Sequence, residues 1–177
     1  MNIVAISGSL RKDSFNTALV RGLQALAPEG MTIMVADISG IPLFDQDAEA
    51  SFPAAAQALK DAIVAADGVI FATPEYNRSI PGVLKNVIDW VSRPYGQSSF
   101  KGKSALIMGV TIGTSGTTAA QDHLKDILTA LEMQLVDQPE LHFGPAQNLF
   151  DAEGNIVDEP TKELLTKALA MLAEQAA

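Results

Sequence analysis

The chain has 177 residues, of which 47% are hydrophobic and 19% charged, and its formal net charge at pH 7 is −9. This length suits a single domain over residues 1–177 with a core of ordinary size. Acidic residues outnumber basic ones by 21 to 12, which argues against nucleic acid as a partner because phosphate contacts need a basic face. Cysteine is absent, which excludes disulfides, cysteine-ligated zinc and a thiol nucleophile.

The N-terminal residues predict no export signal. Met1 and Asn2 lead directly into an apolar run, without the basic region and then the apolar region of a signal peptide. No stretch of about 18 consecutive apolar residues predicts a membrane span. We therefore expect a cytoplasmic protein with no membrane partner.

Apolar runs and helical patterns alternate along the chain. Strands are predicted over residues 2–7, 31–36, 68–73, 103–111 and 133–143. Helices are predicted over residues 14–27, 53–66, 81–93, 117–131 and 160–175. Pro53 and Pro81 suit the first position of their helices. The acidic loop between residues 37 and 52 is expected to be solvated.

This alternation implies parallel strand pairing with right-handed crossovers. Most of the strands are continuous apolar runs, which indicates a sheet covered on both faces. Five strands favour an open, doubly wound α/β sheet over a closed eight-stranded barrel. Such sheets bind ligands beyond the carboxyl ends of their strands. A site is therefore expected in the loops that follow residues 7, 36, 73 and 111.

The first of these loops, GSLRKDSFN (residues 8–16), carries an unusual density of hydrogen-bond donors. A chain that turns at Gly8 and enters a helix points backbone N–H groups at one place, where the helix dipole favours an anion. Side-chain donors come from Ser7, Ser9, Arg11, Ser14, Asn16 and Thr17. We predict a phosphate cradle. The alternative is an ordinary strand-to-helix turn with Ser14 as the N-cap.

Two common phosphate motifs are missing. Neither G-x-x-x-x-G-K-[ST] nor G-x-G-x-x-G occurs, so a P-loop triphosphatase and a dinucleotide-binding fingerprint are not indicated. Asp37 follows the second predicted strand, but without that fingerprint ahead of it. A monophosphate therefore fits the loop better than a pyrophosphate.

The loop after the third strand, TPEYNRSIPG (residues 73–82), is fixed at both ends by proline. It offers backbone donors and acceptors, the Tyr76 ring and the Asn77 amide at the same edge as the cradle. These groups suit the edge of a planar heterocycle. The alternative is an ordered turn with Tyr76 on the surface.

Together, GSLRKDSFN and PEYNRSIPGVLKNVIDW (residues 74–90) resemble the NADPH-dependent FMN reductase family, especially its quinone- and chromate-reducing members. The C-terminal stretch QPELHFGPAQNLFDAEGNIVDEPT is also similar, so the resemblance runs nearly end to end. It implies a flavodoxin-like three-layer sandwich, with a five-stranded parallel sheet between helices, that binds FMN without a covalent link and takes electrons from NADPH or NADH.

The resemblance also implies roles for individual residues. The phosphate would be held by Ser9, Arg11, Ser14 and Asn16, with the backbone amides of Ser14, Phe15, Asn16 and Thr17. The isoalloxazine ring would be bordered by Pro74, Glu75, Tyr76 and Asn77, and by Gly113 and Ser115. One departure is the segment TIGTSGT (residues 111–117), where relatives carry a Gly-Gly-Ala-Arg type of sequence. The arginine is missing here, so no role of that arginine carries over.

Flavin chemistry needs few acid–base side chains, so no catalytic residue is assigned. NADPH or NADH and then an acceptor would use one open face of the ring in turn, in a ping-pong mechanism, with Tyr76 lining that face. The acceptors implied are quinones, azo compounds, flavins and metal oxyanions. Two alternatives remain: a flavodoxin-like electron carrier without turnover of its own, and a mononucleotide-binding regulatory protein without flavin.

No metal site is indicated. His123 and His142 each lack a partner at ligand spacing and are expected to be surface or satisfied structural residues. The family resemblance implies a homodimer or homotetramer. Val83 and Trp90 add apolar surface to a second side of the helix over 81–93, where they mark either a subunit contact or a filled domain edge.

Overall fold

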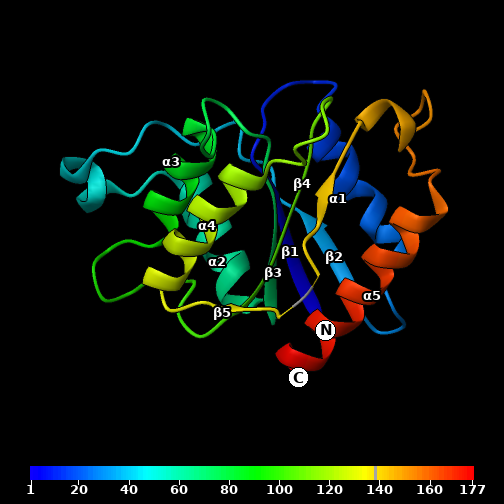
Figure 1. Cartoon of the computed structure of the whole chain (residues 1–177). Helices are drawn as coiled ribbons and strands as arrows, with labels where there is room; N and C mark the ends of the chain where they lie inside the picture. Colours follow the sequence, from blue (N-terminus) through cyan, green and yellow to red (C-terminus); the bar gives the residue numbers. More distant parts are fainter. Residues whose placement is uncertain (138) are drawn as a thin grey trace.

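The computed structural model describes residues 1–137 and 139–177, and it forms three layers (Figure 1). The strands are β1 (Asn2–Ser7), β2 (Thr32–Val35), β3 (Gly68–Ala72), β4 (Ser104–Val110), β5 (Gln134–Leu135) and β6 (His142–Phe143). The helices are α1 (Phe15–Leu26), α2 (Ala54–Ala65), α3 (Gly82–Val91), α4 (Thr118–Ala130) and α5 (Glu159–Ala176). Two short 3-10 helices cover Gln46–Ser51 and Ala146–Asn148.

The sheet has the order β2-β1-β3-β4-β5, and its neighbouring strands pair in parallel. Helices α1 and α5 pack on one face, while α2, α3 and α4 cover the other (Figure 1). β3 and β4 are buried along their whole length, as expected for strands between two helical layers. The predicted flavodoxin-like sandwich with a parallel sheet is confirmed.

The last predicted strand, over 133–143, is divided in two. β5 pairs with the start of β4, and β6 pairs with its end, so that two short strands share one position at the sheet edge. Pro139 lies between them and has no N–H to donate to a continuous ladder. Gln138, which the prediction included, lies outside the described residues.

The two helix-opening prolines stand one position earlier than predicted. Pro53 and Pro81 are the N-caps of α2 and α3, both with extended backbone angles (ψ of 134° and 146°). The helical conformation therefore begins at the next residue. This difference of one residue is normal at helix ends.

Trp90 is fully buried within its own chain. The rings of Phe44 and Phe52 each lie edge-on to the indole, with centroids 5.0 Å away. The indole N–H donates to the carbonyl of Pro42 at 2.8 Å. The segment between β2 and α2 thus covers this side of α3. Trp90 fills a domain edge and does not mark a subunit contact.

One carboxylate of the acidic loop is paired with a cation instead of being solvated as predicted. Glu49 accepts a hydrogen bond from the Arg93 guanidinium at 2.6 Å, and both side chains are largely buried. Asp45 caps the 3-10 helix by accepting from the Asp47 N–H. The expectation of a solvated loop is therefore wrong for Glu49, whose charge is paired with a cation from the end of α3.

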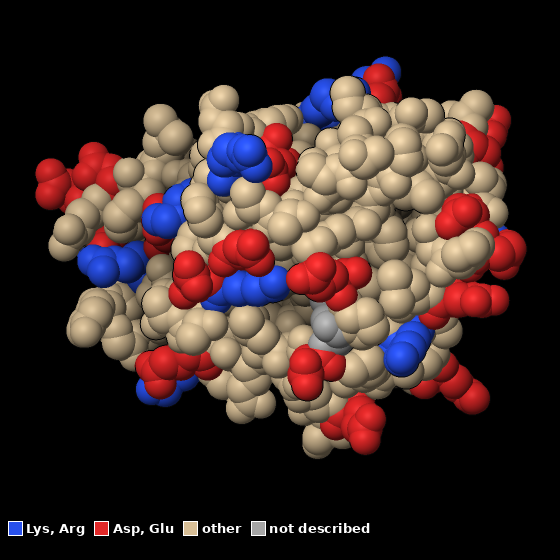
Figure 2. All heavy atoms as spheres, in the orientation of Figure 1, with Lys and Arg blue, Asp and Glu red and all other residues tan. Residues whose placement is uncertain are grey.

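Charge is spread over the surface, with acidic and basic side chains side by side at several places on the face shown in Figure 2. Residues 1–137 and 139–177 contain no cluster of three or more His, Cys, Asp or Glu side chains placed to hold a metal ion. None of the helices in these ranges combines the length and apolar character that crossing a bilayer requires.

Candidate functional site

The loops after β1, β3 and β4 meet at one edge of the sheet and enclose a pocket of about 410 Å³. Most of the predicted cofactor residues line it: Ser9, Arg11, Ser14, Phe15, Asn16, Pro74, Glu75 and Tyr76. Its remaining wall is formed by Val110, Thr111 and Ile112. None of these three was among the predicted site residues, although all are close in sequence to the predicted Gly113. Four predicted residues lie outside this lining: Thr17, Asn77, Gly113 and Ser115.

The start of α1 offers free backbone donors to this pocket. Ser14 is the N-cap, and its hydroxyl accepts from the Thr17 N–H at 3.3 Å. The first N–H groups of a helix have no intrahelical acceptor. Within the described part of the chain, the N–H groups of Phe15 and Asn16 meet no other acceptor either. With the positive end of the helix dipole, they form the anion-binding geometry expected of a phosphate cradle.

Asn16 has a structural role that the sequence did not reveal. Its side-chain amide donates to the Val110 carbonyl at 2.9 Å and accepts from the Val110 N–H at 3.0 Å. The residue is only 3% exposed. This pair of bonds fastens the first turn of α1 to the end of β4. The predicted contact between its side chain and a phosphate stays a prediction.

Thr17 pairs with Ser7 instead of facing this pocket. Their hydroxyl oxygens are 2.8 Å apart, and both residues line a neighbouring cavity. Arg11 is exposed at the pocket mouth, with its guanidinium carbon 5.6 Å from the centre of the Phe15 ring. This cation–π contact holds the guanidinium close to the start of α1.

The loop after β3 turns sharply at Asn77 and Arg78. Tyr76 and Ser79 exchange two backbone hydrogen bonds, at 3.0 and 3.1 Å. Both residues between them have positive φ (52° and 65°), as in a type I′ turn. Asn adopts this conformation readily, whereas Arg does so at some cost. The turn holds Tyr76 half-exposed at the pocket rim and carries Asn77 away from the lining.

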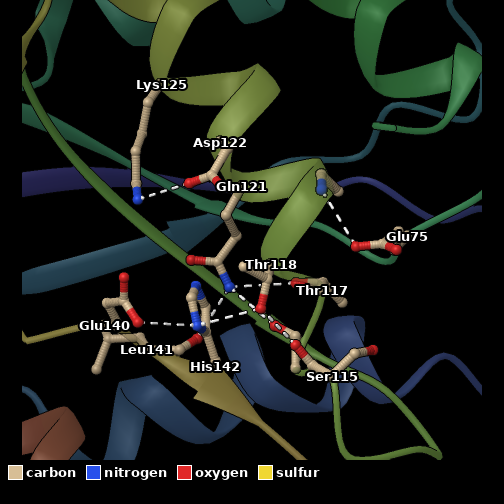
Figure 3. A network of polar contacts seen from close by, with 12 residues as sticks. Glu75, Ser115, Thr117, Thr118, Gln121, Asp122, Lys125, Glu140, Leu141 and His142 are labelled. Atoms are coloured by element: carbon tan, nitrogen blue, oxygen red, sulfur yellow. Dashed lines mark hydrogen bonds and ion pairs between the residues drawn. The ribbon is translucent and has the colours of Figure 1, made fainter. Parts of the chain in front are cut away.

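Glu75 joins this loop to α4 (Figure 3). The N-cap of α4, Thr117, makes no side-chain capping bond. The Glu75 carboxylate takes that role by accepting from the Ala120 N–H at 3.2 Å. A carboxylate at this position also complements the positive end of the helix dipole. The loop predicted to border a planar ring is therefore anchored to the helix that follows β4.

The side chain of Gln121 holds the segment after β4 (Figure 3). The side-chain amide of Gln121 lies 3.1 Å from each of three acceptors, on Gly116, Thr117 and Leu141. Gly116 has a positive φ of 58°, and a Cβ there would collide with His142. Glycine is therefore required where this segment crosses β6.

The two histidines were predicted to be surface or satisfied structural residues, and one atom of His142 departs from this prediction. His123 lies on α4, where its Nδ1 is 3.0 Å from the Ser79 hydroxyl. His142 places its Nδ1 3.4 Å from both the Thr118 hydroxyl and the Glu140 carboxylate. Its Nε2 is buried without a partner among the described residues. The expectation of a surface or satisfied side chain is wrong for this atom of His142.

The fold and this edge geometry define a mononucleotide-binding protein of the flavodoxin type. A sequence model of the NADPH-dependent FMN reductase family matches residues 1–148. The chain belongs to this family, whose cofactor is FMN and whose electron donor is NAD(P)H, and it is accordingly an oxidoreductase.

Similar proteins extend the match along the rest of the chain. A 2-hydroxy-1,4-benzoquinone reductase of a Burkholderia species is 46% identical over 165 residues, which cover 93% of this chain and 90% of the relative. An NAD(P)H-dependent FMN reductase of Pseudomonas aeruginosa is 46% identical over 173 residues, covering 97% and 93%. The structure of FerB, a flavoenzyme NAD(P)H:(acceptor) oxidoreductase of Paracoccus denitrificans, superposes with a TM-score of 0.91 at 36% identity, covering 99% and 96%.

Because Asn16 makes two hydrogen bonds with the backbone of Val110, removing its side chain should lower the stability of the protein measurably. Asn16→Ala leaves both backbone groups of Val110 without these partners, and each buried unsatisfied group costs about 1–3 kcal/mol. We expect urea denaturation of the flavin-free protein to show at least about 2 kcal/mol less stability, the sum of two such costs at the lower end of their range. Asn148→Ala, at an exposed asparagine, serves as the control. Equal stabilities of the two variants would show that the hydrogen bonds between Asn16 and Val110 do not stabilise the fold.

Proposed function

We propose that the pocket of about 410 Å³ binds FMN and that the protein passes electrons from NADPH or NADH to small acceptors by a ping-pong mechanism. The observation that carries this proposal is the convergence of a phosphate-binding helix start and a Tyr76-bearing loop on one pocket. Quinones are the first acceptor class to test, because the Burkholderia relative is named for a benzoquinone substrate. Azo compounds, other flavins and metal oxyanions are further acceptors to test.

The donors available at the cradle fit a terminal phosphate. The free N–H groups of Phe15 and Asn16 lie at the positive end of the α1 dipole, beside the pocket. The hydroxyls of Ser9 and Ser14 line the same space, and Arg11 supplies a planar cation at its mouth. These five residues would hold the phosphate. The side chain of Asn16 would act mainly by keeping the helix start in place.

The ring would lie between the loops after β3 and β4. Pro74, Glu75 and Tyr76 form one side of the pocket, and Thr111 and Ile112 the other. Asn77, Gly113 and Ser115 stand farther along the same two loops, where they would border the outer part of the ring. When bound, FMN supplies the acceptance and release of electrons. The protein orients the ring, hydrogen-bonds its polar edge through backbone groups and leaves one face open, without a general base.

One open face explains why donor and acceptor would bind in turn. A pocket of this volume suits one mononucleotide, so a second molecule must approach from the solvent side. Tyr76 is 54% exposed at that side and offers an aromatic surface to planar acceptors. The donor would leave before the acceptor could take its place.

We further propose a cytoplasmic homodimer or homotetramer. Trp90 no longer supports an interface, but two exposed apolar side chains do: Leu43, in the segment bonded to α3, is 85% exposed, and Tyr95, which follows α3, is 90% exposed. In an assembly of the kind that the family resemblance implies, these two side chains would be covered by a neighbouring subunit. Sedimentation velocity at micromolar concentration should show a dimer or tetramer, and Tyr95→Ser should shift the population toward monomer. A monomer for the unaltered protein would refute the assembly.

The central test is whether the purified protein takes up FMN and turns over alone. We expect calorimetric binding of FMN, a yellow product with absorption near about 450 nm, and steady NADPH oxidation with a benzoquinone. Double-reciprocal plots at several quinone concentrations should be parallel, as in a ping-pong mechanism. FMN uptake without steady oxidation would favour the electron-carrier alternative, which the net charge of −9 also suits. Failure to take up FMN would overturn the proposal and leave the regulatory alternative.

Two substitutions should separate cofactor binding from acceptor reduction. Arg11→Ala should raise the Kd for FMN about tenfold, because a charge-assisted contact with the phosphate is lost. Tyr76→Ala should leave that Kd within about twofold and lower kcat/KM for a quinone about tenfold, which corresponds to about 1.4 kcal/mol. Tyr76→Phe keeps the ring and should retain the activity. Unaltered rates of Tyr76→Ala with every acceptor would disprove the role of this side chain.

A further inference from the structure

A second pocket lies beside the phosphate cradle, on its β2 side. Its volume is about 710 Å³, larger than that of the first pocket. Ser9 and Arg11 line both cavities, so the loop after β1 forms the wall between them. The remaining walls come from α1 and from the loop after β2, which the proposed FMN site does not use.

Three basic side chains without ion-pair partners line this second pocket. Within the described residues, Arg11, Lys12 and Arg21 make no ion pair. Most other basic side chains bind carboxylates or backbone carbonyls, among them Lys60, Lys85, Arg93, Lys101, Lys103, Lys125 and Lys162. In a chain with a net charge of −9, unpaired cations gathered in one cavity indicate an anionic ligand.

Arg21 reaches this pocket from the same helix that forms the cradle. Thr17 and Arg21 are four residues apart on α1, so they lie on one face of the helix, and both line the cavity. Phe15 and Asn16, whose free N–H groups form the cradle, belong instead to the first pocket. Different residues of α1 therefore line the two pockets.

Two carboxylates line the pocket as well as the three cations. Asp37 stands after β2 and accepts a hydrogen bond from the Ser39 N–H at 2.9 Å. Backbone and side-chain hydrogen bonds from Ser39 lower the pKa of Asp37, so the group remains ionised. The Gly-rich dinucleotide fingerprint is absent here, but an ionised carboxylate that lines the pocket can still accept hydrogen bonds from ribose hydroxyls. Asp13 also lines the pocket, so its three cations exceed its carboxylates by one, the extra cation being Arg11, which the pocket shares with the cradle.

We propose that this second pocket binds a phosphorylated ribose of the nicotinamide dinucleotide donor. Lys12 and Arg21 hold the phosphate oxygens, and Asp37 accepts from a ribose hydroxyl. This inference rests on the proposed function, because it gives the donor of that reaction a binding site of its own. It also places basic side chains where the donor's phosphates approach the FMN phosphate, so that Arg11 and Lys12 offset the repulsion between them.

Calorimetric titration with two nucleotide fragments tests the proposal directly. Adenosine 2′-monophosphate represents the phosphate that distinguishes NADPH from NADH, and adenosine 5′-monophosphate represents the pyrophosphate end. We expect the FMN-loaded protein to bind at least one of them without release of FMN. Arg21→Ala and Lys12→Ala should each raise its Kd about tenfold. Lys167→Ala, at an exposed unpaired lysine on α5, should leave the Kd unchanged.

Steady-state kinetics provide a second readout. Arg21→Ala should raise KM for the donor and leave kcat and the Kd for FMN unchanged. A larger effect on NADPH than on NADH would assign Arg21 to the 2′-phosphate, and equal effects would assign it to the pyrophosphate.

Three results would overturn the inference. The first is that neither fragment binds, and the second is that both variants bind the fragments as tightly as Lys167→Ala does. The third is displacement of FMN by the fragment, which would place it in the cradle. The titration can also be made on flavin-free protein. The FMN proposal and this inference can therefore be refuted separately.

Discussion

The two hydrogen bonds between Asn16 and Val110 hold the first turn of α1 against the end of β4. A parallel sheet brings the loops after its strands to one edge, but it does not fix their mutual distance. The buried amide does so here, because it satisfies both backbone groups of a residue 94 positions away. The free N–H groups of Phe15 and Asn16 depend on this placement for their direction. The proposed phosphate site therefore rests on a contact that itself needs no ligand.

The other side of the pocket is fixed by a separate set of contacts. Glu75 ties the loop after β3 to α4, and Gln121 ties the segment after β4 to Leu141, the residue before β6. Neither loop forms a long regular element, yet each is bonded to the start of the same helix (Figure 3). Thus α4 aligns the two loops between which the ring is proposed to lie. Glu75 and Asn16, which were predicted to contact the ligand, thus also hold the loops of the site in place.

Much of the fold was predictable, because apolar runs and helical patterns are local signals. The division of the last strand was not, since it depends on which parts of 133–143 can pair with β4. The convergence of Ser9, Ser14 and Tyr76 followed from the parallel pairing of the strands, which brings their carboxyl ends to one edge. The capping role of Glu75 and the covering of Trp90 by Phe44 and Phe52 could not be predicted. Both are contacts between distant segments, for which one sequence holds no periodic signal.

The covering of Trp90 has an optical consequence. It is the single tryptophan of the chain, and its indole is shielded from water by two phenyl rings. Detachment of the segment between β2 and α2 would hydrate the indole and move its emission to longer wavelength. The protein thus contains an intrinsic fluorophore that reports on this one segment, apart from any colour contributed by a bound flavin.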